Sequence, residues 1–405
     1  MVSVQKNYLN LSPYHLAKFV AKAGYKTVKF GISKAPQYLG ASAASVGSLY
    51  IQYLVMKSAL NTASGYVGQY HELDGGYSKV GFTDKEIVSF FKSKSSASSG
   101  NGILCTQFKS EKISDIQDLL HKIYESSNDT DAQQILTAQV ISKLFVNYYS
   151  EFIYEGLEIE IPTVSSENQK VLTKYVVDKK FNLWNGVPAF ALKDVESKAS
   201  PLLLFRASNT VLEENDSLPT LVANFHPKGP AWKLFSNSEK GIEAWLKEQQ
   251  KETGQKARVI GYSQGGILGA YFLTYHPQYF SQSEQNPSFI LDAPGVSSKV
   301  GAIWDQINEK PFVKTYVHRG DLIPKIGDCF IGKAFEVRIA QKLKGFDAHR
   351  ALSFASPQWK IVEIATDLER KSKARIIISG MQKLASLVVY NPAKALLPCI
   401  HALKS

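Results

Sequence analysis

Apolar residues follow two different periods along this chain, and the change between them divides it. Between residues 113 and 156 they recur at helical spacing, which predicts two or three amphipathic helices with Ser114 and Asp129 or Thr130 as caps. From about Gln169 onward they gather in short runs rich in β-branched and aromatic residues, which are typical of strands. The pattern therefore predicts a helical region followed by a sheet.

The sheet region alternates strands with helices. We expect a long helix at residues 241–254 and strands at 171–177, 188–194, 201–208, 257–260, 288–295 and 312–321. An apolar stretch that follows Ser263 and has no breaker before Pro277 predicts a second helix. Such alternation is typical of an α/β fold with a mostly parallel sheet and helices on both faces.

Composition places the chain among globular proteins, and its charge is unevenly distributed. With 405 residues, 44% hydrophobic and 20% charged, it can build a sizeable core and at least one further domain. The formal net charge is +11, but residues 1–71 contain seven lysines and no acid, and residues 371–405 contain six basic residues and no acid. Removing these thirteen charges leaves −2 on residues 72–370.

The basic flanks suit an anionic membrane surface or an acidic partner, and a plain solvated face is the alternative. Nucleic acid is not expected as a partner, because the flanks lack arginine clusters with stacking aromatics. Ser12 and Pro13 predict the start of a basic amphipathic helix, and the continuing lysines argue against a secretory signal peptide. Peripheral membrane association is therefore one expectation, and no compartment follows from the sequence.

Three regions are expected. Residues 1–155 form a helical N-terminal region with no catalytic pattern, residues 156–370 form the α/β domain, and residues 371–405 form a basic amphipathic tail. The uncharged segment 35–56 predicts a buried or hairpin-forming helix, or alternatively a membrane span. The aromatic-rich segment 218–235 predicts a strand with a packed loop, or alternatively a lid or acyl-binding wall.

A serine stands at the turn between a predicted strand and a predicted helix. The sequence Gly261-Tyr262-Ser263-Gln264-Gly265 places small residues two positions either side of Ser263, as a sharp strand-to-helix turn requires. Such a turn exposes the hydroxyl at the carboxyl end of the sheet and aims free N–H groups of the helix at an oxyanion. Ser263 is therefore the candidate nucleophile, and an ordinary glycine-rich turn is the alternative.

A serine nucleophile needs a base and an acid that orients the base. Among the histidines after Ser263, His349 follows the last predicted core strand, whereas His276 lies at a helix end, His318 lies within a strand and His401 lies on the basic tail. For the acid, Asp321 closes a strand before a rigid turn at Pro324, and Asp292 at the end of the preceding strand is the alternate.

Two backbone N–H groups are expected to form an oxyanion hole. One is that of Gln264, directly after the nucleophile, and the other comes from the loop after strand 201–208, where Ser208 is the natural candidate. The Ser208 hydroxyl could supply a further donor. This chemistry requires no cofactor. The three cysteines, Cys105, Cys329 and Cys399, are widely spaced and predict neither a disulfide framework nor a metal site.

Four motifs together resemble a known family. They are Phe205-Arg206-Ala207-Ser208, Gly261-Tyr262-Ser263-Gln264-Gly265-Gly266, Asp321-Leu322-Ile323-Pro324 and His349. In order and approximate spacing they resemble the class 3, fungal-type lipases, over about residues 170–356. The resemblance implies an α/β-hydrolase fold and a lipase-like serine esterase that hydrolyses acyl esters of lipids, with Ser263, Asp321 and His349 as its triad.

A different class of function remains open. Ala207 stands where the family usually has glycine, and neither flank resembles the family. The alternative is therefore a catalytically silent α/β-hydrolase fold that acts as a membrane-associated binding or interaction module.

Overall fold

The computed structural model of the chain describes residues 103–104, 112–126, 130–165, 167–208, 223–224, 226, 228–339, 343, 345–353 and 359–366. The expected basic start, the segment 35–56 and the tail 371–405 lie outside these residues, and the three-region division stays a prediction. Within the described part, no helix is long and apolar enough to span a membrane.

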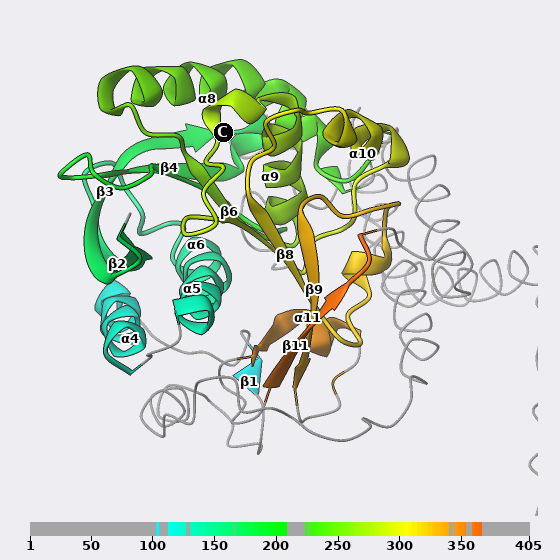
Figure 1. Cartoon of the computed structure of the whole chain (residues 1–405), viewed down its shortest axis with the longest axis horizontal. Coiled ribbons are helices and arrows are strands. Elements are labelled where there is room, and N and C mark those ends of the chain that lie inside the picture. The colour runs from blue at the N-terminus through cyan, green and yellow to red at the C-terminus, as the bar shows by residue number, and fades with distance from the viewer. Residues whose placement is uncertain are drawn as a thin grey trace, which may run out of the picture.

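The described strands form one large mixed sheet and one small antiparallel pair (Figure 1). The large sheet has the order β11-β9-β8-β7-β6-β5-β4-β3-β2. Its strands are β2 (Glu158–Val164), β3 (Lys170–Asn182), β4 (Pro188–Asp194), β5 (Leu202–Phe205), β6 (Arg258–Tyr262), β7 (Ser288–Leu291), β8 (Val313–His318), β9 (Lys333–Ile339) and β11 (Trp359–Ile364). The small pair joins β1 (Ile103–Leu104) to β10 (Ala351–Leu352).

The parallel part of the large sheet is its centre. Strands β5 to β9 run parallel to one another, whereas β2, β3 and β4 join antiparallel at one edge and β11 joins antiparallel at the other. The expectation of a mostly parallel sheet therefore holds for the strands around the serine turn, and the whole sheet is mixed. The strands β2, β9 and β11 are not among those expected from the sequence.

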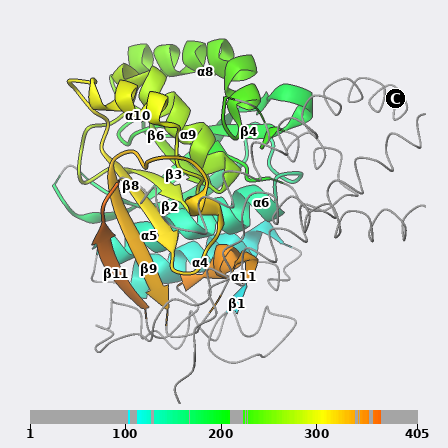
Figure 2. The same ribbon diagram turned by 90° about the vertical axis from the view of Figure 1, so that its right-hand side faces the viewer.

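The helices lie on both faces of the sheet. They are α4 (Ile113–Ser126), α5 (Thr130–Gln139), the π-helix η2 (Val140–Phe145), α6 (Val146–Tyr148), α8 (Trp232–Thr253), α9 (Gln264–Tyr275), α10 (Ser298–Asp305) and α11 (Phe346–Arg350). Short 3₁₀ turns are η3 (Trp184–Gly186), η4 (Pro277–Tyr279) and η5 (Ile323–Lys325). Both views show α8, α9 and α10 together on one side of the sheet (Figure 1, Figure 2).

The central strands send alternate side chains into two cores. On β5, Leu202 and Leu204 belong to one core with the helices before the sheet, while Leu203 and Phe205 belong to the other with α8 and α9. Strand residues alternate between the faces with a period of two, so a parallel strand covered on both faces is apolar throughout. This explains why the unbroken run Leu202–Phe205 is a strand.

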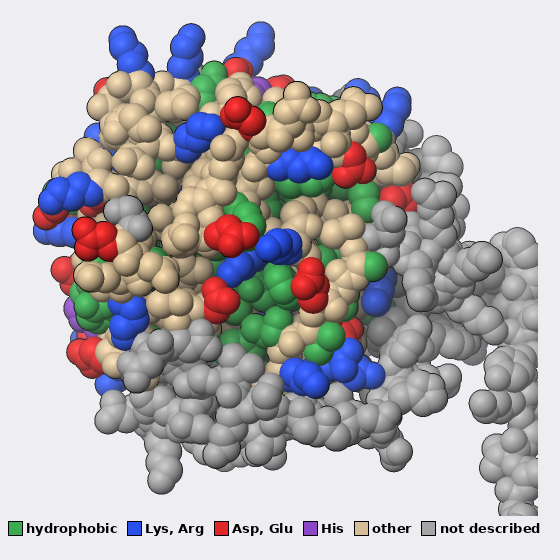
Figure 3. Space-filling view, in the orientation of Figure 1, with side chains coloured by type: hydrophobic (Ala, Val, Ile, Leu, Met, Phe, Trp, Pro, Cys, Tyr) green, Lys and Arg blue, Asp and Glu red, His purple; other side chains and the backbone are tan. Residues whose placement is uncertain are grey.

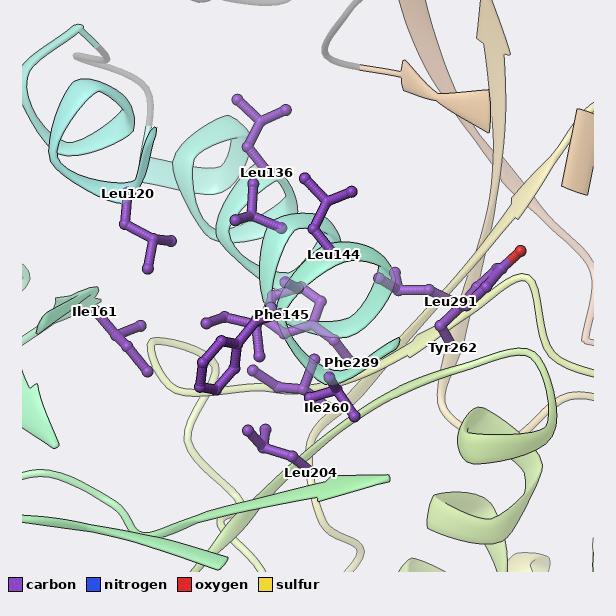
Figure 4. Close-up of a cluster of buried hydrophobic side chains, with 14 of the residues drawn as sticks. Leu120, Leu136, Leu144, Phe145, Ile161, Leu204, Ile260, Tyr262, Phe289 and Leu291 are labelled. Carbon is purple, nitrogen blue, oxygen red and sulfur yellow. The ribbon is translucent and has the colours of Figure 1, made fainter. Parts of the chain in front are cut away.

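The helical residues 113–148 share their core with the sheet. Side chains of α4, α5 and η2, including Leu120, Leu136 and Phe145, pack against those of the strands, including Ile260 and Phe289 (Figure 4). The core thus continues across the expected boundary at residue 155, and it brings the N-terminal helices beneath the strands that carry the candidate site.

Part of the segment 218–235 is helical. Residues Trp232, Leu234 and Phe235 belong to the first turn of α8, and the last two are buried in the core with Phe272. Because these residues lie in a helix that packs on the core, they form neither the expected strand nor a lid. Residues 209–222 lie outside the described part of the chain.

Candidate active site

Ser263 stands alone between a strand and a helix. Strand β6 ends at Tyr262 and helix α9 begins at Gln264, and the backbone of Ser263 has φ 55° and ψ −122°, in the left-handed half that side chains rarely adopt. Strain of this kind costs about 1–3 kcal/mol and is typical of functional turns. The turn holds the hydroxyl at the carboxyl end of β6.

The flanking glycines allow strand and helix to approach this closely. A Cβ atom at Gly261 would overlap backbone atoms of Gly265, and a Cβ at Gly265 would overlap the backbone carbonyls of Phe205 and Arg206. Backbone atoms cannot rotate away as a flexible side chain can. Glycine is therefore required at both positions for steric reasons, although neither has a positive φ.

The structure brings Ser263, His349 and Asp321 together. His349, in α11, lies with Nε2 at 2.9 Å from the Ser263 Oγ and with Nδ1 at 2.7 Å from an Asp321 carboxylate oxygen. All three side chains are at least nine-tenths buried. Because a carboxylate only accepts hydrogen bonds, Nδ1 donates to Asp321 and Nε2 is left to accept from the serine hydroxyl.

Asp321 lies just beyond the end of β8. Its other carboxylate oxygen accepts from the Ile323 N–H at 2.9 Å, so the turn that precedes Pro324 fixes the acid in place. Burial raises the pKa of the Asp321 carboxyl, and the negative charge of Asp292 adds to this effect, while the contact with His349 opposes it. The ionised form of Asp321 therefore depends on the histidine beside it.

Asp292, the alternate acid, contacts a different histidine. Its carboxylate accepts hydrogen bonds from the N–H and the Nδ1 of His318 and from the Lys143 Nζ, the last at 2.6 Å. Burial alone would raise the pKa of Asp292, but the charges of His318 and Lys143 outweigh it and hold the pKa well below the ordinary value. Asp292 is thus a buried anion with its own partners, and Asp321 is the acid beside His349.

The expected oxyanion residues are linked through a third side chain. The Gln264 Nε2 donates to the Asn224 Oδ1 at 2.9 Å, and the Asn224 Nδ2 donates to the Ser208 Oγ at 2.6 Å. These bonds tie the loop after β5 to the first residue of α9. The positive end of the helix dipole lies at this first turn, so this end of α9 suits a developing negative charge.

Ala207 fits its place without strain. It is not among the non-glycine residues with positive φ in the described part of the chain, and its N–H donates to the Asn147 Oδ1 at 3.1 Å. The methyl group packs in the core shared with the N-terminal helices. Alanine in place of glycine here therefore leaves the loop in a regular conformation.

Sequence reasoning missed the contribution of the helices before the sheet. Lys143, from η2, donates to Asp292, and Asn147, from α6, accepts from Ala207. Asn224 connects the two expected oxyanion residues. The signal in the sequence was a lysine in a mainly apolar helical run, Val140–Phe145, because lysine is almost never fully buried unless it is paired.

Charged side chains of both signs are interspersed on the face seen in Figure 3. Lysine and arginine side chains project along the edge where α8 lies. The basic flanks that suggest a membrane surface are outside the described residues, so this expectation stays a prediction.

Comparisons with solved structures find fungal lipases. One crystal structure of a fungal lipase has 14% identity and a TM-score of 0.39, with 61% of this chain and 90% of that chain covered. The triacylglycerol lipase from Penicillium expansum has 13% identity and a TM-score of 0.32, covering 47% and 72%. Lipase II from Rhizopus niveus has 15% identity and a TM-score of 0.31, covering 50% and 75%.

No protein-family model matches the sequence, and no curated protein matches it significantly. With identities of 13–15% and TM-scores below 0.5, the similarity to fungal lipases leaves the function to be argued from the side chains of the site.

Proposed function

We propose that this chain is a serine esterase that hydrolyses acyl esters of lipids, with Ser263 as nucleophile, His349 as general base and Asp321 as the orienting acid. The observation that carries the proposal is the continuous hydrogen-bonded line from Asp321 through His349 to Ser263, at 2.7 and 2.9 Å, on a strained strand-to-helix turn. Nucleophile, base and orienting group within hydrogen-bond reach are the arrangement that activates a serine.

The first half of the reaction forms an acyl-enzyme. As the Ser263 Oγ attacks the ester carbonyl carbon, its proton passes to the His349 Nε2, and Asp321 stabilises the resulting imidazolium. The carbonyl oxygen becomes an oxyanion, which accepts hydrogen bonds from the backbone N–H groups of Gln264 and Ser208. The ester bond then breaks, and the leaving alkoxide takes the proton from His349.

The second half returns the enzyme to its starting state. Water attacks the acyl carbon while His349 removes one of its protons, and the same two N–H groups hold the second oxyanion. Collapse releases the carboxylic acid, and the proton returns to the Ser263 Oγ.

A lipid substrate is supported by the motif order and by the charge of the flanks. The basic residues of segments 1–71 and 371–405 would attract the chain to an anionic lipid surface, at about 1 kcal/mol for each basic side chain close to it. Attraction of this kind would bring the chain to a surface that contains lipid esters.

Ser263→Ala provides the test. We expect the wild-type chain to hydrolyse a panel of water-soluble acyl esters and phospholipids and to be labelled by a fluorophosphonate, and Ser263→Ala to do neither. Ser238→Ala is the matched control, because the Ser238 hydroxyl donates within its own helix, to the carbonyls of Leu234 and Phe235, and it should behave as wild type. Anionic vesicles should increase the rate on phospholipids more than on soluble esters.

Two results would contradict the proposal. Full activity of Ser263→Ala on a short acyl ester would exclude this serine as the nucleophile. A folded wild-type chain that neither hydrolyses any ester nor reacts with the fluorophosphonate would favour the silent α/β-hydrolase fold and a binding role.

A further inference from the structure

Three polar side chains lie four residues apart on a mainly apolar helical run, whose one other polar residue, Ser142, donates to the Ala138 carbonyl within the run. They are Gln139 at the end of α5, Lys143 in η2 and Asn147 in α6. Gln139 and Lys143 are buried with almost no exposed surface, while their neighbours on the run pack into the core against the sheet. We call these three residues the polar stripe.

Every polar stripe residue hydrogen-bonds to a segment of the candidate active site. The Gln139 side chain pairs with the Ser353 hydroxyl, shortly after His349 in the chain, through contacts of 2.6 and 2.8 Å. Asn147 accepts from the Ala207 N–H, in the loop after β5. The central residue, Lys143, reaches the segment that carries His349. The polar stripe therefore contacts both the segment that carries His349 and the loop after β5. The distances of these two segments from Ser263 decide whether acyl transfer can occur.

The Lys143 ammonium uses its hydrogen bonds in two directions. It donates to the Asp292 carboxylate at 2.6 Å, and on the other side it donates to the carbonyls of Ala351 at 2.8 Å and His349 at 3.4 Å. Its Nζ also lies 4.7 Å from the centre of the Tyr262 ring, next to Ser263 in sequence. A buried ammonium is costly unless it is paired and fully hydrogen-bonded, and these contacts meet that requirement.

The His349 main chain is held from a second direction as well. The Tyr262 hydroxyl donates to the His349 carbonyl at 2.8 Å, and the two rings stack with centroids 4.9 Å apart. Lys143 and Tyr262 thus both bond to the backbone around His349, whereas the imidazole itself bonds to Ser263 and Asp321. The backbone contacts fix where the imidazole stands.

We propose that Lys143 is a positioning residue, which holds the His349 segment so that the imidazole reaches Ser263, with Asp292 as the counter-ion that allows its ammonium to be buried. This inference rests on the proposed esterase function. Lys143 touches neither the nucleophile nor the base side chain, so it acts on the reaction through the geometry of His349.

The experiment separates the hydrogen bonds of Lys143 from its charge. Lys143→Met removes both and leaves Asp292 without its cation. The double variant Lys143→Met with Asp292→Asn restores charge balance but leaves the carbonyls of His349 and Ala351 without the lysine donor. Rates are measured with a soluble p-nitrophenyl ester, and each preparation is normalised by fluorophosphonate titration so that only folded, reactive chains are counted.

We expect kcat to fall about 10-fold to 100-fold in both variants with KM within about twofold, as for a displaced catalytic group. The double variant should regain most of the unfolding midpoint that Lys143→Met loses. Tyr262→Phe, which removes the second donor to the His349 carbonyl and keeps the stacked ring, should lower kcat in the same direction by a smaller factor. Lys180→Met is the matched control: Lys180 also donates to two backbone carbonyls, those of Ser150 and Ile153, and its loss should leave kcat unchanged.

Wild-type kcat in the double variant would overturn the inference, because the lysine would then only neutralise Asp292. If Lys143→Met does not fold, the double variant and Tyr262→Phe decide the question by the same criterion. Failure of the esterase proposal is recognised separately, since wild type itself would then show neither turnover nor labelling.

Discussion

The close approach of β5 and α9 at Gly265 makes a sharp prediction about stability. A Cβ added there would lie 2.8 Å from the Phe205 carbonyl carbon and 2.9 Å from the Arg206 oxygen, and would overlap the Phe205 oxygen still more closely. Contacts under 3.0 Å with backbone force strand and helix apart. The strand end that must move leads directly into Ala207 and Ser208.

Two opposing effects determine how much Gly265→Ala changes the free energy of unfolding. Alanine is favoured over glycine in a helix by about 1 kcal/mol, whereas overpacking of a rigid site costs about 1–3 kcal/mol and more where only backbone can yield. We therefore expect Gly265→Ala to lower the free energy of unfolding by about 2 kcal/mol. Gly241→Ala is the control: Gly241 lies in α8 with no atom within 4 Å of the added Cβ, so this change should raise stability by about 1 kcal/mol.

Urea unfolding followed by tryptophan fluorescence measures both variants. The two changes are chemically identical and both lie in helices, so their opposite signs can only arise from the contacts around each Cβ. Equal stability of Gly265→Ala and Gly241→Ala would refute the packing of β5 against α9 described above. Activity should fall in Gly265→Ala alone, because only that change displaces the serine turn.

Two further predictions concern the buried acids. Asp321→Asn should keep the fold but lower kcat by about 10³ to 10⁴. The amide favours the tautomer in which the His349 Nε2 carries the proton and therefore cannot accept from Ser263. A near wild-type kcat would exclude Asp321 as the orienting acid. Asp292→Asn should lower the free energy of unfolding by about 3–5 kcal/mol at neutral pH, because it leaves the buried Lys143 ammonium without its anion. Since the folded pKa of Asp292 lies below its ordinary value, its ionised form stabilises the protein fully above an unfolded pKa of about 3.9, and that stability is lost as the pH falls through the folded pKa. The free energies of unfolding of wild type and Asp292→Asn, measured by urea titration, should therefore differ by a constant amount from pH 8 to about pH 5, and this difference should shrink below about pH 4. A difference that stays constant down to the lowest measurable pH would contradict this assignment.

Much of the fold around the serine turn could be predicted from the chain. The strands containing residues 188–194, 202–205, 258–262, 288–291 and 313–318 were all indicated by short apolar runs, and all are present. Other strands were missed for identifiable reasons. Strand β2 contains Pro162, which is tolerated because β2 is an edge strand, and β9 and β11 have many polar residues because they lie towards the other edge.

Strand direction and the partners of buried charges could not be predicted in the same way. A run such as Glu158–Val164 has the same period whether it pairs parallel or antiparallel, so the antiparallel edges of the sheet depend on which strands meet. Likewise, Asp292 and Asp321 both follow a strand, and the rigid turn at Pro324 favours Asp321 in the sequence without fixing which of the two acids lies beside His349. Their surroundings differ in the fold, where Asp292 meets Lys143 and His318 while Asp321 meets His349.

Local features follow from the sequence alone: the buried strands, the glycines around Ser263, and the order of serine, acid and histidine along the chain. These depend on backbone sterics and on side-chain periodicity, which act over a few residues. In contrast, the contact of Lys143 with a segment about 200 residues later and the hydrogen bond of Asn147 to Ala207 depend on how the chain folds. A buried polar group must find its partner in space, and the packing of the N-terminal helices against the sheet selects which partner that is.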